Sequence, residues 1–280
     1  MANYIIFDKL HKKLITKPFK SAGERFLKEF YIAKYAIKTN ASDIGAENYP
    51  LNPKLFAKRF AEILARAGKN GESIIACDTS SYLSLLLSKR FIASGADIKK
   101  EIDQFLNPLE LTADFLSDIV HINTFAASHG VIENIEKNLK YPFEGFKAAV
   151  YYGADIRIDE RSNRELDKFF EAIKLKCVKF SKEFSSDGYE LLRYAPDTAF
   201  KMAGAVLLDA FDSGADFLVV SDARTFYLME AKRKQIIKAV GREIPIYILT
   251  PPQLALLSIG VTDSDALGFD AHKIKPPLIG

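Results

Sequence analysis

The sequence predicts an α/β protein with mostly parallel sheets. Short apolar runs bounded by turn residues alternate with longer segments of helical period, and this alternation is typical of parallel strands covered by helices. The chain has 280 residues, of which 48% are hydrophobic and 27% are charged. Because this length and composition can bury two cores of ordinary size, we expect two domains.

The predicted elements follow that alternation in order. Short apolar runs predict strands at 4–7, 73–77, 148–153, 177–180, 217–221 and 246–250. Segments of helical period predict helices at 21–38, 53–68, 79–93, 98–106, 112–119, 127–139, 163–174, 196–213, 224–240 and 251–259. Pro53, Pro196 and Pro251 stand near three helix starts, where the missing N–H of proline costs little. Residues 140–145, KYPFEG, are the best candidate for a linker.

Composition argues against several classes of protein. The apolar runs are far shorter than the roughly 20 residues of a membrane-spanning helix, and the start of the chain lacks a secretory pattern, so we expect a cytoplasmic protein without a membrane span. Cys77 and Cys177 are too few for a disulfide framework or a four-cysteine metal site. Residues 9–38 hold nine Lys or Arg against two Glu. We interpret this segment as a solvated helix face, with an acidic partner or an anionic membrane surface as the alternatives; no nucleic-acid-binding motif accompanies it.

The two halves of the chain resemble each other. SIIACDTSSYLSLLLSKR, from Ser73, lies over FLVVSDARTFYLMEAKRK, from Phe217, at a shift of 144 residues. YIIFDK lies over VYYGAD, and ASDIGAE over FSSDGYE, at shifts of 146 and 143. Three matches in one order, at nearly one offset, predict two tandem copies at 1–143 and 144–280. Chance similarity of strand ends is the alternative.

The second half of the chain resembles the HdrB-like proteins, the tandem CCG-domain family of heterodisulfide reductase. The resemblance rests on VYYGADIRIDERSNRELDKFFEAIKLKCVKF, FSSDG, GADFLVVSDARTFYLMEAKRKQI, IPIYILTPPQLALLSIGV and LGFDAHKIKPPLIG, and it is weaker over the first half. It implies two tandem Rossmann-like domains of the CCG type. In that family each domain carries one cysteine, then Cys-Cys-Gly, then Cys-x-x-Cys, and these cysteines bind iron–sulfur clusters that do disulfide chemistry and electron transfer.

When the family's cysteine positions are carried over to this sequence, almost none of them holds a cysteine. In the second copy these positions hold Ala154, Ser186, Asp187, Ser221 and Arg224, and in the first copy they hold Asp8, Asp43, Cys77 and Ser80. Soft thiolate sulfur suits iron, whereas serine, alanine and arginine offer no equivalent ligand. The resemblance therefore implies vacant cluster positions, and we expect neither an iron–sulfur cluster nor another metal.

Four carboxylates follow or neighbour predicted strands, namely Asp78, Asp155, Asp187 and Asp222. Ligands of open parallel sheets bind beyond the carboxyl ends of the strands, so these groups would be polar contacts in a cleft between the lobes. The structural alternative is that Asp78 and Asp222 cap the helices that follow them. Cys77 likewise has two interpretations, a nucleophile at a helix N-terminus or an inert remnant at the end of a buried strand.

Two functions remain. The leading hypothesis is a non-enzymatic accessory or scaffold subunit that keeps the family's docking surface and binds an iron–sulfur or flavin redox subunit. An exposed apolar patch would support it. The alternative is a small-molecule enzyme or binder that uses the cleft between the lobes, which a pocket of converging carboxylates with perturbed pKa values would favour.

Overall fold

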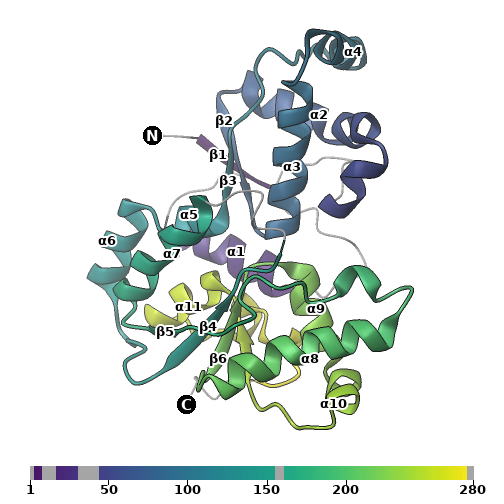
Figure 1. Ribbon diagram of the computed structural model, residues 1–280. Helices are drawn as coiled ribbons and strands as arrows, with labels where there is room; N and C mark the ends of the chain where they lie inside the picture. The colour runs from purple at the N-terminus through teal and green to yellow at the C-terminus, as the bar shows by residue number, and fades with distance from the viewer. Residues whose placement is uncertain (1–2, 8–16, 31–43, 155–160, 276–280) are drawn as a thin grey trace. The chain divides into compact units, whose positions relative to one another are not determined.

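The computed structural model describes residues 3–7, 17–30, 44–154 and 161–275 (Figure 1). The chain divides into two compact units: unit 1 is Met1–Lys13 with Ile32–Ile122, and unit 2 is Leu14–Tyr31 with Asn123–Gly280. Each unit holds its own parallel sheet surrounded by helices. The predicted α/β class with two mostly parallel sheets is therefore confirmed.

Unit 1 is built on a parallel sheet with strand order β1-β2-β3. Its strands are β1 (Asn3–Phe7), β2 (Glu72–Ala76) and β3 (Ile119–His121). Its helices are α2 (Pro53–Lys69), α3 (Thr79–Ile92) and α4 (Ala96–Leu106), with 3-10 turns η1 (Ala46–Leu51) and η2 (Asn107–Leu109). Helices α2 and α3 pack on each other and on the sheet (Figure 1). In the core of this unit, Phe7 of β1 and Phe60 of α2 are buried and meet edge to face, with ring centroids 6.2 Å apart.

Local chemistry fixes both ends of α2. At its start, the side chain of Asn52 accepts the N–H of Leu55 at 3.0 Å and Pro53 takes the first helical position. Near its end, Gly68 lies under the backbone of Phe115, where an added Cβ would come within 1.8 Å of the carbonyl oxygen. Only glycine therefore allows this close approach.

The predicted helix at 112–119 is wrong. The segment is an irregular connection that leads into β3, a strand of three residues that gives no recognisable apolar run. Its backbone is hydrogen-bonded to other segments of the unit: the Ala113 N–H donates to the Asp103 carboxylate at 2.7 Å, and the Ser117 N–H donates to the Leu64 carbonyl at 3.0 Å. These tertiary hydrogen bonds replace the local ones that a helix would make.

Unit 2 is built on a parallel sheet with strand order β5-β4-β6-β7. Its strands are β4 (Lys147–Tyr151), β5 (Lys176–Val178), β6 (Phe217–Val220) and β7 (Tyr247–Leu249). Its helices include α6 (His129–Asn138), α7 (Arg161–Ala172), α8 (Pro196–Asp212), α9 (Ala223–Ala231), α10 (Arg233–Val240), α11 (Pro251–Ser258) and α12 (Ser264–Leu267), with turns η4 (Tyr189–Leu191) and η5 (Phe269–Ala271). Helix α5 (Ile122–Ala126) begins at the division between the units.

Helix α1 (Lys17–Phe30) packs in unit 2, although it lies near the start of the chain. It contacts α11 and α12. Its Phe19 meets Phe226 edge to face at 5.8 Å, and Lys17 pairs with Asp270 at 2.8 Å. The compact units are therefore interleaved along the sequence. The predicted tandem copies at 1–143 and 144–280 describe ancestry and stay a prediction.

Three smaller expectations for unit 2 are revised. The predicted helix at 224–240 is two helices, α9 and α10, which meet at Lys232. The predicted linker at 140–145 lies within unit 2, where the N–H groups of Lys140 and Tyr141 both donate to the Ser258 carbonyl, at 2.8 and 2.9 Å. Cys177 begins the apolar run CVKF, which predicts a position in the core, but it lies exposed on the edge strand β5.

Buried polar groups of unit 2 form hydrogen bonds with His272 and Lys273, near the end of the described residues. Glu230 is fully buried, faces Arg233 at 3.5 Å and accepts the Lys273 N–H at 2.7 Å. Gln253 contacts the ring of His272 at 2.9 Å, and burial lowers the pKa of His272 to about 4. His272 is therefore a neutral core residue at physiological pH.

Candidate functional site

The strand order of unit 2 reverses between β4 and β6. The chain runs from β4 to β5 on one side and then crosses to β6 on the other, so the carboxyl ends of β4 and β6 form a topological switch point. Crevices for ligands in open parallel sheets form at such points. Ala154 follows β4, whereas Ser221 and Asp222 follow β6 directly. This edge is the candidate site of unit 2.

Asp222 caps helix α9. Its carboxylate accepts the N–H groups of Arg224 and Thr225 at 2.9 and 3.1 Å, which satisfies two donors that the first turn leaves open. The buried guanidinium of Arg224 lies over the ring of Tyr189 at 5.5 Å, and its Nε is 3.5 Å from the Asp222 carboxylate. The structural interpretation of Asp222 as a helix cap is therefore correct.

Ser221 is paired with a residue that the sequence did not indicate. Its hydroxyl lies between the two atoms of the Asn123 amide, 2.9 Å from Nδ2 and 3.1 Å from Oδ1. Asn123 is only 1% exposed, so this pair satisfies a buried amide. A position that holds cysteine in the resembled family thus holds a hydroxyl bonded within the same unit.

Asp187 carries the most perturbed carboxyl of the site. One oxygen accepts the Tyr189 N–H at 2.9 Å, while the other is buried and has no hydrogen bond of ordinary geometry, although the Thr225 side chain lies close enough to influence the carboxyl. Burial raises the pKa of Asp187 to about 6, against the lowering effect of the Thr225 side chain and the Tyr189 N–H, and the charges of Glu190 and Asp222 add to the rise. The neighbouring Ser186 hydroxyl accepts the N–H of Gly188 at 3.0 Å, which shapes the turn.

The corresponding residues of unit 1 are buried at the start of α3. Asp78 caps this helix by accepting the Ser81 N–H at 3.2 Å, so its interpretation as a cap is also correct. Cys77 is 2% exposed and Ser80 is fully buried. The ring of His121, at the end of β3, lies 3.1 Å from the Thr79 hydroxyl. The exposed fraction of Cys77 supports its interpretation as a buried remnant, because a nucleophile must be reached by its substrate.

The predicted residues fall into three sets. Ser186, Asp187, Ser221, Asp222 and Arg224 all belong to unit 2, where Arg224 faces Asp222 and the charge of Asp222 acts on Asp187, and Cys77, Asp78 and Ser80 lie at the start of α3 in unit 1. Asp8, Asp43 and Asp155 lie outside the described residues, and Ala154 is exposed after β4. Over the described ranges, no group of three or more His, Cys, Asp or Glu side chains could hold a metal ion. The arrangement supplies hydrogen bonds and helix caps.

Comparison with known families identifies the second half of the chain. Residues 189–273 match the family described as the HdrB-like C-terminal domain. The chain therefore carries an HdrB-like domain. This domain contains β6, β7 and helices α8 to α12, and it includes Ser221, Asp222 and Arg224 of the candidate site. The resemblance inferred from the sequence is thus shown for this part of the chain.

Two individual proteins extend the comparison. The 8-methylmenaquinol:fumarate reductase membrane anchor subunit of Wolinella succinogenes is 21% identical over 228 residues, which cover 79% of this chain and 78% of that protein. The crystal structure of a hypothetical protein from Helicobacter pylori is similar with a TM-score of 0.86 and 24% identity over 99% of this chain. The match covers 53% of the Helicobacter pylori chain, so this protein spans about half its length. That likeness shows the fold alone.

Among the described residues, no helix is both long enough and apolar enough to cross a bilayer.

Proposed function

We propose that this protein is a non-catalytic accessory subunit of a redox complex, in which the HdrB-like domain serves as a docking scaffold. One observation carries the proposal: the HdrB-like domain is retained, while its strand-end positions hold residues engaged in hydrogen bonds within the unit. Ser221 is bonded to Asn123, and Asp222 caps α9. These positions therefore hold internal hydrogen bonds and a helix cap, whereas an iron–sulfur cluster requires thiolate ligands there.

We further propose that the protein holds no iron–sulfur cluster. Ala154, Ser186, Ser221 and Arg224 occupy four of the family's cysteine positions, and none of them supplies a soft sulfur ligand. Anaerobic incubation of the purified chain with iron and sulfide tests this directly. We expect no cluster absorption band and no iron retained after desalting. A band that disappears in Cys77→Ala would refute the proposal and point to a site that uses the remaining thiol.

The expected partner is an iron–sulfur or flavin subunit in the cytoplasm. Support comes from the Wolinella succinogenes relative, whose name makes it a subunit of a fumarate reductase. The proposed partner would supply the electron-transfer groups that this chain lacks. We do not expect a nucleic-acid partner. The described strand ends carry carboxylates and hydroxyls, whereas binding to phosphates requires cations.

Strand pairing supports the proposed internal repeat of two CCG-type units. The order β1-β2-β3 corresponds to β4-β6-β7, with parallel pairing in both sheets. Tyr4 pairs with Ser73 in unit 1, and Ala148 pairs with Phe217 in unit 2. Both members of the second pair lie 144 residues beyond those of the first. One shift therefore superposes two neighbouring strands.

A second candidate function rests on Asp187. A buried carboxyl with a raised pKa and one oxygen without a hydrogen bond of ordinary geometry, at a topological switch point, is typical of a position that meets a ligand. The alternative is therefore a small-molecule enzyme or binder that uses the strand ends of unit 2. A metabolite screen by thermal shift tests it with Asp187→Asn as the matched variant. A metabolite that stabilises the wild type and not the variant favours this alternative.

Anaerobic co-purification of the untagged protein from its native cell, with partners identified by mass spectrometry, tests the main proposal. We expect an iron–sulfur or flavin subunit in equal amount. Recovery of the chain alone under conditions of low and moderate salt would overturn the accessory-subunit proposal for a stable complex.

A further inference from the structure

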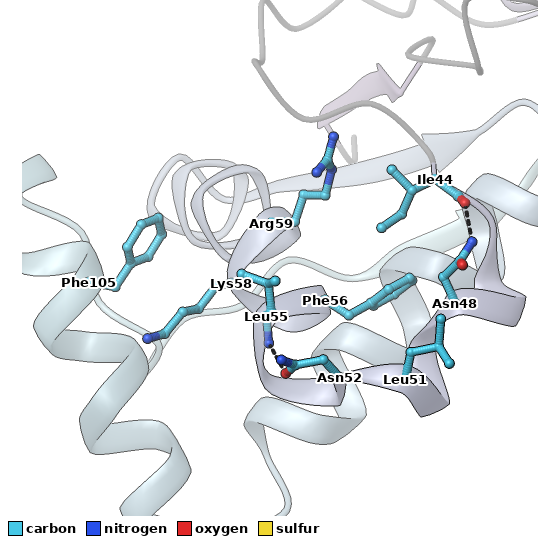
Figure 2. Close-up of a pocket in the computed structure, with 9 residues that line it drawn as sticks. All are labelled: Ile44, Asn48, Leu51, Asn52, Leu55, Phe56, Lys58, Arg59 and Phe105. Atoms are coloured by element: carbon cyan, nitrogen blue, oxygen red, sulfur yellow. Dashed lines mark hydrogen bonds between the residues drawn. The ribbon is translucent and has the colours of Figure 1, made fainter.

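We draw no further inference here: the strongest candidate, the apolar groove of unit 1 between η1, α2 and α4 where Leu51 and Leu55 lie exposed (Figure 2), carries none because nothing in the described structure shows what covers it.

Discussion

Replacing Asp187 by asparagine should stabilise unit 2 increasingly as the pH rises. The carboxyl of Asp187 is buried, and one of its oxygens has no hydrogen bond of ordinary geometry, so the Thr225 side chain and the Tyr189 N–H offset only part of the cost of burial. Asparagine keeps an oxygen for the N–H of Tyr189, which donates to Asp187 at 2.9 Å. It removes the negative charge that the buried site disfavours.

The magnitude follows from the pKa of Asp187, which burial raises from 3.8 to about 6. At pH values below the unfolded-state pKa the carboxyl is neutral in both states and costs no free energy of ionisation. As the pH rises from that value to the folded-state pKa, the unfolded chain loses its proton first, so the folded state loses about 3 kcal/mol of stability relative to the unfolded state. Above about pH 7 the loss is complete.

Urea unfolding of the wild type and Asp187→Asn at about pH 4.5 and about pH 7.5 measures this effect. The difference in free energy of unfolding between the two proteins should grow by about 2 kcal/mol in favour of the variant, because the rest of the shift is lost below that range. Any constant cost of burying the amide cancels in this comparison, as do other titrating groups common to both proteins. Hydrogen exchange in α9 peptides confines the measurement to unit 2.

A difference that stays constant between the two pH values would refute the reasoning, since it would mean that Asp187 has the same pKa folded and unfolded. A wild type that gains stability relative to the variant as the pH rises would refute it more strongly. The carboxylate would then have a cationic or hydrogen-bonding partner in solution.

Three other predictions concern stability, each measured by urea unfolding with circular dichroism. Asp222→Ala removes the cap of α9 and should cost about 1 kcal/mol, and Asp222→Asn should restore most of it. Gly68→Ala should destabilise unit 1 by more than about 2 kcal/mol, whereas Gly130→Ala, at a helical position with open space around it, should stabilise unit 2 by up to about 1 kcal/mol. If both variants changed the free energy of unfolding in the same direction, the close approach at Gly68 would be contradicted. Glu230→Ala should cost about 3 to 5 kcal/mol because it leaves the buried guanidinium of Arg233 without its carboxylate, and a loss below about 1 kcal/mol would contradict the buried pair.

The regular elements were predictable because their signals are local. The apolar runs that end at Cys77 and Ser221 match β2 and β6 to within one residue, and the aspartates that follow them were correctly expected to cap α3 and α9. Strand β3 has three residues and no local signal of its own, because its pairing with β2 defines it. The membership of α1 in unit 2 depends on a contact between Phe19 and Phe226, which no local pattern encodes.

The candidate site was predictable in its positions and less so in its contacts. The family resemblance predicts that Ser186, Asp187, Ser221 and Arg224 share one site, and all four belong to unit 2; a common site stays a prediction. The partner of Ser221 is Asn123, which lies 98 residues away, so neither spacing nor residue type could reveal it. The exposure of Leu51 and Leu55 was missed for a related reason.

Leu51 and Leu55 stand four residues apart, a spacing that usually indicates a buried helix face. The core instead takes the neighbouring Phe56, so the leucines face outward. Only the packing of η1 and α4 around the start of α2 reveals this choice.

The two candidate functions make different demands on the same carboxyl group. A scaffold has no use for a buried charge that costs about 3 kcal/mol at neutral pH, so Asp187→Asn should leave recovery of the partner unchanged while it raises stability. A ligand-binding site has such a use, because a group that is poorly solvated when empty gains most from a bound partner. Loss of ligand-induced stabilisation in Asp187→Asn, together with unchanged partner recovery, would therefore assign the carboxyl to a small molecule and leave docking of the partner to other residues of the chain.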